Sequence, residues 1–194
     1  MGKISLSTSP DIALAPSIEM PAWLQEIEQE NLGKAMPGDE EKILFAIMLA
    51  IENVRRGTGG PFGAAIFELG THRLIATGIN LVAGTGQSWA HAEMTAFANA
   101  QNRLGRADLK GYLLAASCEP CAMCFGATPW SGVEMLIYGA RGEAAQNIGF
   151  DEGDKVADWQ QSLENRNIKV IGPLPGDRAD EPFRLYRELG GVIY

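Results

Sequence analysis

The sequence predicts a three-layer α/β domain, in which helices cover both faces of a β-sheet. Short apolar runs typical of strands alternate along the chain with segments of helical periodicity, and this alternation is the pattern of a sheet packed between helices. The chain has 194 residues, of which 46% are hydrophobic and 21% are charged. This length and composition are those of one globular domain with a hydrophobic core of its own.

Residues 1–38 are predicted to be an N-terminal extension of the main domain, residues 39–194. The extension contains four prolines, Pro10, Pro16, Pro21 and Pro37, and many small polar residues. Its one amphipathic segment, 22–32, would end at Gly33. We expect a loosely docked arm, with an arm exchanged between two chains as the alternative.

Residues 39–56 are predicted to form a helix, since apolar side chains recur at helical spacing. The segment begins with acidic residues and ends with arginines, which matches the polarity of the helix dipole. The glycine-rich stretch 57–61 breaks this helix. Two β-rich runs, 62–68 and 74–82, follow and are predicted to pair as an antiparallel hairpin.

The rest of the chain continues the alternation of helices and strands. Pro120 is well placed at the first position of a helix that contains Cys121 and Cys124, because proline is favoured there. The predicted elements are a helix over 90–104, a buried strand over 112–117, a helix over 121–130, a strand over 135–139, a short helix over 143–148, a glycine-rich loop over 149–153, a helix over 156–164, a strand over 168–172 and a helix over 181–189.

Charge and composition exclude several classes of partner. The net charge of −8 opposes binding to polyanions, and no cluster of Lys and Arg is present, so we expect no nucleic-acid partner. No apolar run reaches the ~20 residues of a membrane span, and the N-terminus lacks the pattern of a secretory signal. Two of the three cysteines form a C-x-x-C, which favours metal binding in a reducing compartment. We therefore expect a cytoplasmic protein without a membrane partner.

Three residues have the chemistry and spacing of metal ligands. His91, Cys121 and Cys124 can hold a zinc ion through one nitrogen and two sulfurs, and three protein ligands leave a position open, as in catalytic zinc sites. Cys121 and Cys124 share one face of the first turn of a predicted helix, where the dipole favours thiolates. Cys118 lies before the helix and is a weaker candidate.

Glu93 follows His91 by two residues and is placed to move protons instead of binding the metal. Zinc lowers the pKa of a bound water molecule toward ~7, and a positioned carboxylate is worth roughly 10²- to 10⁴-fold in rate. This combination suits hydrolytic attack on an amino-bearing ring carbon with release of ammonia. A catalytically silent, zinc-bound scaffold or binding module is the alternative, but such a site gains nothing from Glu93.

The pattern H-x-E followed by P-C-x-x-C is the signature of zinc deaminases. From residue 39 to the C-terminus the chain resembles the cytidine deaminase-like superfamily. The resemblance implies a five-stranded mixed sheet sandwiched by helices, with one zinc ion per subunit held by His91, Cys121 and Cys124. It also implies that Glu93 is the proton shuttle.

Further residues indicate a branch of this superfamily. The segment 119–127, followed by Trp130, is similar to the branch of bacterial guanine deaminases and tRNA adenosine deaminases. The segment 148–152 resembles the G-F-D-D/E segment of guanine deaminases, which implies that Glu152 is a second catalytic acid. Asp151 is the less favoured holder of this role, and a solvated acidic loop formed by Asp151 and Glu152 with Asp154 is the alternative.

The same resemblance implies the substrate-binding residues. Asn80 corresponds to the family asparagine that hydrogen-bonds the base, and an amide can both donate and accept there. The resemblance also implies a C-terminal lid that can be exchanged between the subunits of a homodimer, with Gly190 and Gly191 as its hinge. The remaining candidates are Phe62 and Phe150 as aromatic faces, Trp130 as a pocket wall, Ala92 beside the zinc ligand, and Tyr194 as a lid residue.

These features together predict a deaminase of a free nucleobase. The resemblance implies the conversion of guanine to xanthine and ammonia, a step of purine metabolism, with aminotriazines such as ammeline as further candidate substrates. The enzymatic alternatives are tRNA adenosine, cytosine and nucleosides such as guanosine or cytidine. A tRNA or nucleoside substrate would require basic or ribose-binding residues that the sequence does not show.

Overall fold

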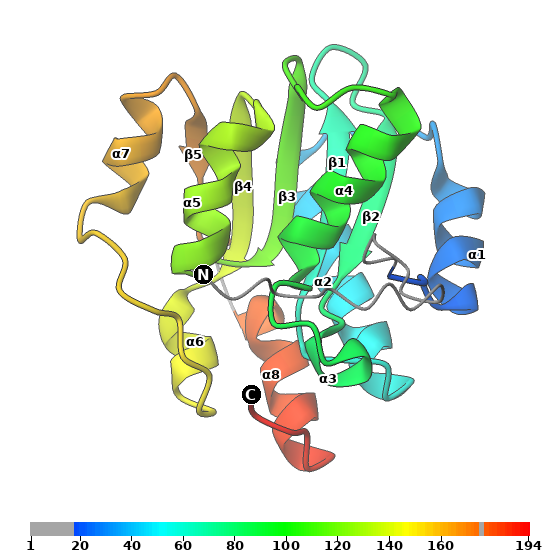
Figure 1. Ribbon diagram of the computed structural model, residues 1–194, viewed down its shortest axis with the longest axis vertical. Coiled ribbons are helices and arrows are strands. Elements are labelled where there is room, and N and C mark those ends of the chain that lie inside the picture. The colour runs from blue at the N-terminus through cyan, green and yellow to red at the C-terminus, as the bar shows by residue number, and fades with distance from the viewer. Residues whose placement is uncertain (1–17, 175–176) are drawn as a thin grey trace, which may run out of the picture.

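A computed structural model describes residues 18–174 and 177–194, and Figure 1 shows a central sheet between layers of helices. The sheet has five strands in the order β2-β1-β3-β4-β5. Strand β1 is antiparallel to β2 and β3, whereas β3, β4 and β5 are parallel, so the expected five-stranded mixed sheet is confirmed. The strands are β1 Gly63–Glu68, β2 Leu74–Ile79, β3 Tyr112–Cys118, β4 Met135–Ala140 and β5 Lys169–Ile171.

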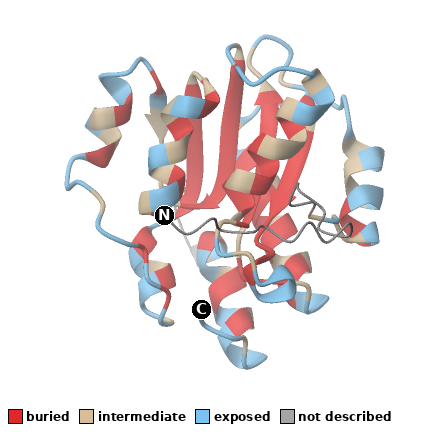
Figure 2. Ribbon diagram, in the orientation of Figure 1, coloured by how far each residue is buried: buried red, intermediate tan, exposed pale blue. Residues whose placement is uncertain are grey.

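Helices cover both faces of the sheet. Helices α4 (Ala92–Leu104) and α5 (Ala122–Ser131) cross in front of it in Figure 1, and α2 (Asp39–Arg55) lies behind it. Strands β3 and β4 are buried along their whole length, as Figure 2 shows, because both of their faces are covered. The remaining helices are α1 Ala22–Asn31, α3 Val82–Thr85, α6 Gly142–Gln146, α7 Trp159–Glu164, α8 Glu181–Glu188 and the 3₁₀ helix η1 Asp177–Asp180.

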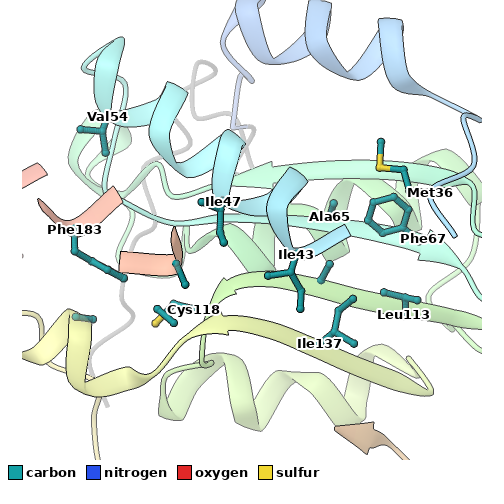
Figure 3. Close-up of a cluster of buried hydrophobic side chains, with 14 of the residues drawn as sticks. Met36, Ile43, Ile47, Val54, Ala65, Phe67, Leu113, Cys118, Ile137 and Phe183 are labelled. Atoms are coloured by element: carbon teal, nitrogen blue, oxygen red, sulfur yellow. The ribbon is translucent and has the colours of Figure 1, made fainter. Parts of the chain in front are cut away.

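The larger hydrophobic cluster lies between α2, α8 and the sheet (Figure 3). Ile43 and Ile47 on α2 pack toward the strands, which contribute Ala65 and Ile137 to the same cluster, and Phe183 of α8 joins it from the side. A second cluster lies on the opposite face, between the sheet and α4 and α7. The amphipathic periodicity of residues 39–56 therefore produces the helix that the sequence predicts, with its apolar side toward the sheet.

Helix α1 packs against the domain, so the expected loose docking is wrong for the described part of the extension, residues 18–38. Trp23 and Leu24 are buried in a third cluster with residues of α2 and of the segments that follow β2. The carboxylate of Glu28 accepts hydrogen bonds from the backbone N–H and the hydroxyl of Thr77 at 2.6 and 2.7 Å. This N–H lies on the open edge of strand β2, so Glu28 gives it a partner that no neighbouring strand provides. Pro10 and Pro16 lie outside the described residues.

Several element boundaries differ from those predicted. Strand β2 ends at Ile79, and the side chain of the next residue, Asn80, accepts a hydrogen bond from the backbone N–H of Val82, the first residue of the short helix α3. Helix α5 begins at Ala122, with Cys121 as its N-cap, so Pro120 lies before the helix. Helix α7 begins at Trp159. Within the described ranges, no helix has the length and apolar character needed to cross a bilayer.

Replacing Leu24 by Ala tests whether α1 is an integral part of the domain. Leu24 is 1% exposed, so we expect Leu24→Ala to lower the free energy of unfolding by about 2–5 kcal/mol in urea titrations. Leu32 at the end of α1 is 43% exposed and serves as the control, for which we expect a change within about 0.5 kcal/mol. Equal losses for the two variants would contradict the packing of α1.

Candidate active site

Four segments meet at one end of the sheet, the lower end in Figure 1. The strand register sets this meeting, since Ile79 at the end of β2 pairs with Gly63 at the start of β1. Ala64 pairs in turn with Ala116 near the end of β3, and Cys118 with Ala140 at the end of β4. The residues that flank these strand ends, among them Asn80, Phe62 and Glu119, therefore line one cavity.

The predicted metal ligands converge beside this cavity from two helix N-termini. His91 is the N-cap of α4, Cys121 is the N-cap of α5, and Cys124 lies in the first turn of α5. Nδ1 of His91 lies 3.4 Å from Sγ of Cys121 and 3.7 Å from Sγ of Cys124. All three ligand atoms lie within 4.8 Å of one another.

This donor set fits zinc. With Zn–S and Zn–N distances of about 2.3 and 2.0 Å, ligand atoms around a tetrahedral zinc ion lie roughly 3.5–3.8 Å apart, close to the separations found here. Nδ1 is the His91 nitrogen that faces both sulfurs, so it is the atom that would bind the metal. Among the residues that the structure describes, these three form the one cluster of His, Cys, Asp and Glu side chains able to hold a metal ion.

The protonation of the three ligands is coupled. A hydrogen bond from the Cys124 thiol, aided by His91, lowers the pKa of Cys121 to about 4 despite its burial. The same hydrogen bond, together with burial, raises the pKa of Cys124. Burial favours neutral His91, but its hydrogen bond to Cys121 and the nearby carboxylates outweigh this effect and raise its pKa. A metal ion that binds here must therefore displace the proton of the Cys124 thiol.

Two buried carboxyl groups line the cavity beside the ligands. Glu93 lies in the first turn of α4, and burial together with the Cys121 thiolate raises its pKa. Glu152 belongs to the loop that follows α6, and burial, then Cys121 and Glu93, raise its pKa to about 8. Each side chain is 8% exposed, so the acidic segment 151–152 is not simply a solvated loop. A carboxyl group with such a pKa holds a proton at neutral pH and can donate it.

Two contacts hold the loop of Glu152 against the metal-binding helix. The backbone carbonyl of Glu152 accepts a hydrogen bond of 2.8 Å from the N–H of Ala122, the first residue of α5. The ammonium group of Lys155 pairs with the carboxylate of Glu119 and donates to the carbonyl of Pro120 at 2.7 Å. Glu119 lies in the cavity wall directly before the P-C-x-x-C motif, although no sequence pattern predicts a role for it.

Aromatic rings form another wall of the cavity. The ring of Phe150 meets that of Phe62 edge to face at 5.1 Å and that of Tyr194 at 5.2 Å, and it stacks on Tyr186 at 5.8 Å. The Tyr194 side chain also reaches Asn80, and burial raises the pKa of its hydroxyl. The open space left between these side chains is about 50 Å³, enough for a few water molecules.

Two predicted substrate-binding residues do not line the cavity. Trp130 is 87% exposed, because it lies six residues after Cys124 and thus about 120° around α5 from the ligand face. Its assignment as a pocket wall is wrong for this chain. Ala92 is buried in the cluster between α4 and the sheet, where its backbone lies against Gly78 of β2. The other predicted residues, Phe62, Asn80, Phe150 and Tyr194, are in the wall.

Comparison with known proteins agrees with this geometry. The family model of the cytidine and deoxycytidylate deaminase zinc-binding region matches residues 37–140. Guanine deaminase of Bacillus subtilis (strain 168) is 40% identical over 123 residues, which cover 63% of this chain and 78% of that protein.

Solved structures agree as well. The guanine deaminase of Nitrosomonas europaea superimposes with a TM-score of 0.80 at 37% identity, covering 90% of this chain and 95% of the other. A structure in complex with 2,6-diaminopurine gives a TM-score of 0.84 at 38% identity, covering 92% and 95%. The chain therefore belongs to the family defined by the cytidine and deoxycytidylate deaminase zinc-binding region, and within it the chain is similar to guanine deaminases.

Proposed function

We propose that this protein deaminates free guanine, converting it to xanthine and ammonia in purine metabolism. The observation that carries the proposal is the placement of two buried carboxyl groups, Glu93 and Glu152, in one cavity with the three metal ligands and an aromatic wall. A single carboxyl group would suit any deaminase of the family. A second proton donor suits guanine in particular, because its exocyclic amine must leave from a carbon between two ring nitrogens.

His91, Cys121 and Cys124 would hold one zinc ion per subunit. When bound, zinc supplies a Lewis acid that polarises water for attack at neutral pH. Glu93 lies next to the ligands without belonging to them, so its carboxylate can accept a proton from the attacking water molecule. It then returns this proton to the ring nitrogen or to the leaving amine, as one carboxyl group acts first as a base and then as an acid.

Glu152 would act on the leaving group. Burial raises the pKa of its carboxyl group, which favours the protonated form that can donate to the departing amine while Glu93 handles the water molecule. Lys155 and the backbone bond to Ala122 support the loop and keep this acid facing the cavity. Glu93 on α4 and Glu152 on the loop after α6 approach the cavity from different elements, so each can transfer a proton at a different atom of the substrate.

Base recognition would fall to Asn80 and the aromatic rings. The side-chain oxygen of Asn80 accepts from the backbone N–H of Val82 at 3.2 Å, and the Asn80 side chain also bonds to Tyr194. Withdrawal of Tyr194 would free the amide N–H groups to donate to acceptors on a purine edge. Phe62 and Phe150 offer apolar surface to a flat heterocycle. A two-ring purine needs more than the 50 Å³ left open, so the tail with Tyr194 would withdraw for entry and close afterwards.

A cytoplasmic location and a homodimer belong to the same proposal. Helix α5 exposes Met123 and Trp130 on the side away from the sheet, and large exposed apolar side chains favour burial against a second copy. The C-terminal tail folds over the cavity of its own chain, and its exchange between two subunits is the alternative arrangement. The thiol ligands would require a reducing compartment.

Ammonia release tests this proposal directly. We expect the purified protein to release ammonia from guanine, to lose activity when a chelator removes the metal, and to regain it with Zn²⁺. Glu93→Gln should keep its zinc, since Glu93 is not a ligand, and should lower kcat by roughly 10²- to 10⁴-fold. Guanosine, cytosine, adenosine and ammeline complete the panel. Activity on guanosine equal to that on guanine would rule out a free-base enzyme, and stoichiometric zinc without ammonia from any compound would favour a scaffold.

The second acid has a separate test. Glu152→Gln keeps the size of the side chain but removes its ionisable proton, so we expect kcat on guanine to fall at least about 100-fold with zinc content unchanged. Asp154→Asn is the matched control, because Asp154 is an exposed acid two residues away that does not line the cavity. We expect this control to change kcat by less than about twofold. Unchanged turnover in Glu152→Gln would remove Glu152 from the mechanism.

A further inference from the structure

We propose that Asn53 is the positioning residue that sets the base-recognising edge of the cavity, by joining the loop before β1 to the end of β2. Asn53 lies near the C-terminal end of α2 and is completely buried. It does not line the cavity, so any effect on the substrate must act through its neighbours. The inference rests on the proposed function, since it assigns a role to a residue behind the proposed base-binding Asn80.

The Asn53 amide group is fully used in hydrogen bonds. Its Nδ2 donates to the backbone carbonyls of Gly60 and Asn80, each at 2.8 Å, and its Oδ1 accepts from the hydroxyl of Thr58 at 2.6 Å. An amide nitrogen has two N–H groups, and here each has one acceptor. The two carbonyls can only accept, so the orientation of this amide is determined by its partners.

The two carbonyls belong to segments that are brought together at the cavity. Cβ atoms added at Gly59 and Gly60 would collide with the Asn80 carbonyl oxygen and with the Tyr194 hydroxyl, respectively. Gly60 therefore lies against both Asn80 and the C-terminal tail. This close approach places two backbone acceptors side by side, and Asn53 supplies the donors that hold them there.

Further backbone bonds extend this link to the aromatic wall. The N–H of Phe62 donates to the carbonyl of Gly60 at 2.8 Å, and the N–H of Asn80 donates to the carbonyl of Phe62 at 3.1 Å. Asn53 thus closes a small network that includes Asn80, Phe62 and the place where Tyr194 rests. A displacement of this network by about 1 Å would misplace the base relative to the metal and both acids, which strongly slows a reaction that depends on alignment.

A double-mutant cycle with Asn80 tests the proposal. We expect Asn53→Ala to lower kcat/KM for guanine at least about 10-fold, through a lower kcat as well as a higher KM, with zinc content unchanged. In an Asn80→Ala background the same substitution should change kcat/KM by less than about threefold, because the group that it positions is already gone. A purely structural role would give the same factor in both backgrounds, and that result would overturn the proposal.

Asn99→Ala is the matched control. Asn99 of α4 also donates its Nδ2 to a backbone carbonyl at 2.9 Å, that of Thr77, but it lies outside the cavity wall. This control should lower Tm while leaving kcat/KM within about twofold of the wild type. If Asn53→Ala lowered Tm but left kcat/KM equally unchanged, Asn53 would be a stabilising residue only.

A second variant and a measurement without substrate test the positioning role even if Asn53→Ala does not fold. Thr58→Val removes the bond to Oδ1 and a longer one of 3.4 Å to the Asn53 backbone carbonyl, but leaves both Nδ2 bonds in place, so it should fold if Asn53→Ala does not. We expect a fall of about threefold in kcat/KM that disappears in the Asn80→Ala background, and no fall would overturn the proposal. Amide hydrogen exchange over segments 58–62 and 80–82 needs no substrate. It should accelerate at least about 10-fold in Asn53→Ala, or measurably in Thr58→Val, and not in Asn99→Ala. Unchanged exchange would overturn the positioning role, whereas a wild type without activity on guanine would overturn only the proposed function.

Discussion

The meeting of two helix N-termini at one end of the sheet is the constraint on which the site depends. Helices α4 and α5 pack on the same face of the sheet, and each presents a ligand as its N-cap. An N-cap side chain lies at the positive end of a helix dipole, so the same geometry that places Cys121 also favours its thiolate. Glu93 extends from the first turn of α4 and reaches the same point. Ligands and acid are thus positioned by regular secondary structure, which holds side chains more rigidly than loops do.

The other half of the cavity is built from less regular parts. Asn80 and Phe62 lie where the chain leaves or enters the sheet, Glu152 lies on a loop, and Tyr194 ends the chain. The Asn53 amide holds Asn80, and the ring of Phe150 packs against Phe62 and Tyr194. The ion pair of Lys155 and Glu119 holds the loop of Glu152. Burial of Glu152 raises its pKa and so favours the protonated form that the proposed chemistry uses. The metal ligands and Glu93 thus determine the class of reaction. The residues on the strand ends, the loop and the C-terminal tail determine which base is bound.

Much of this arrangement could be predicted from the sequence. The H-x-E and P-C-x-x-C motifs identify the ligands because their spacing is local, and the strands and most helices follow from periodicity. Trp130 shows the limit of this reasoning: its place near the motif suggested a pocket wall, but the turn of α5 carries it to the surface. Asn53 and Glu119 were missed since their partners, Asn80 and Lys155, lie 27 and 36 residues away in the chain. The firm packing of helix α1 could not be predicted for a similar reason, because Glu28 bonds to Thr77 across 49 residues.

The central claim is that three protein ligands, and not four, hold the metal. X-ray absorption spectroscopy at the zinc edge of the purified protein tests it most directly, because bond lengths to sulfur and to nitrogen or oxygen differ by about 0.3 Å. The account predicts one zinc ion per chain with two sulfur ligands, one imidazole nitrogen and one exchangeable oxygen from solvent. A third sulfur ligand, which would have to come from Cys118, would contradict it.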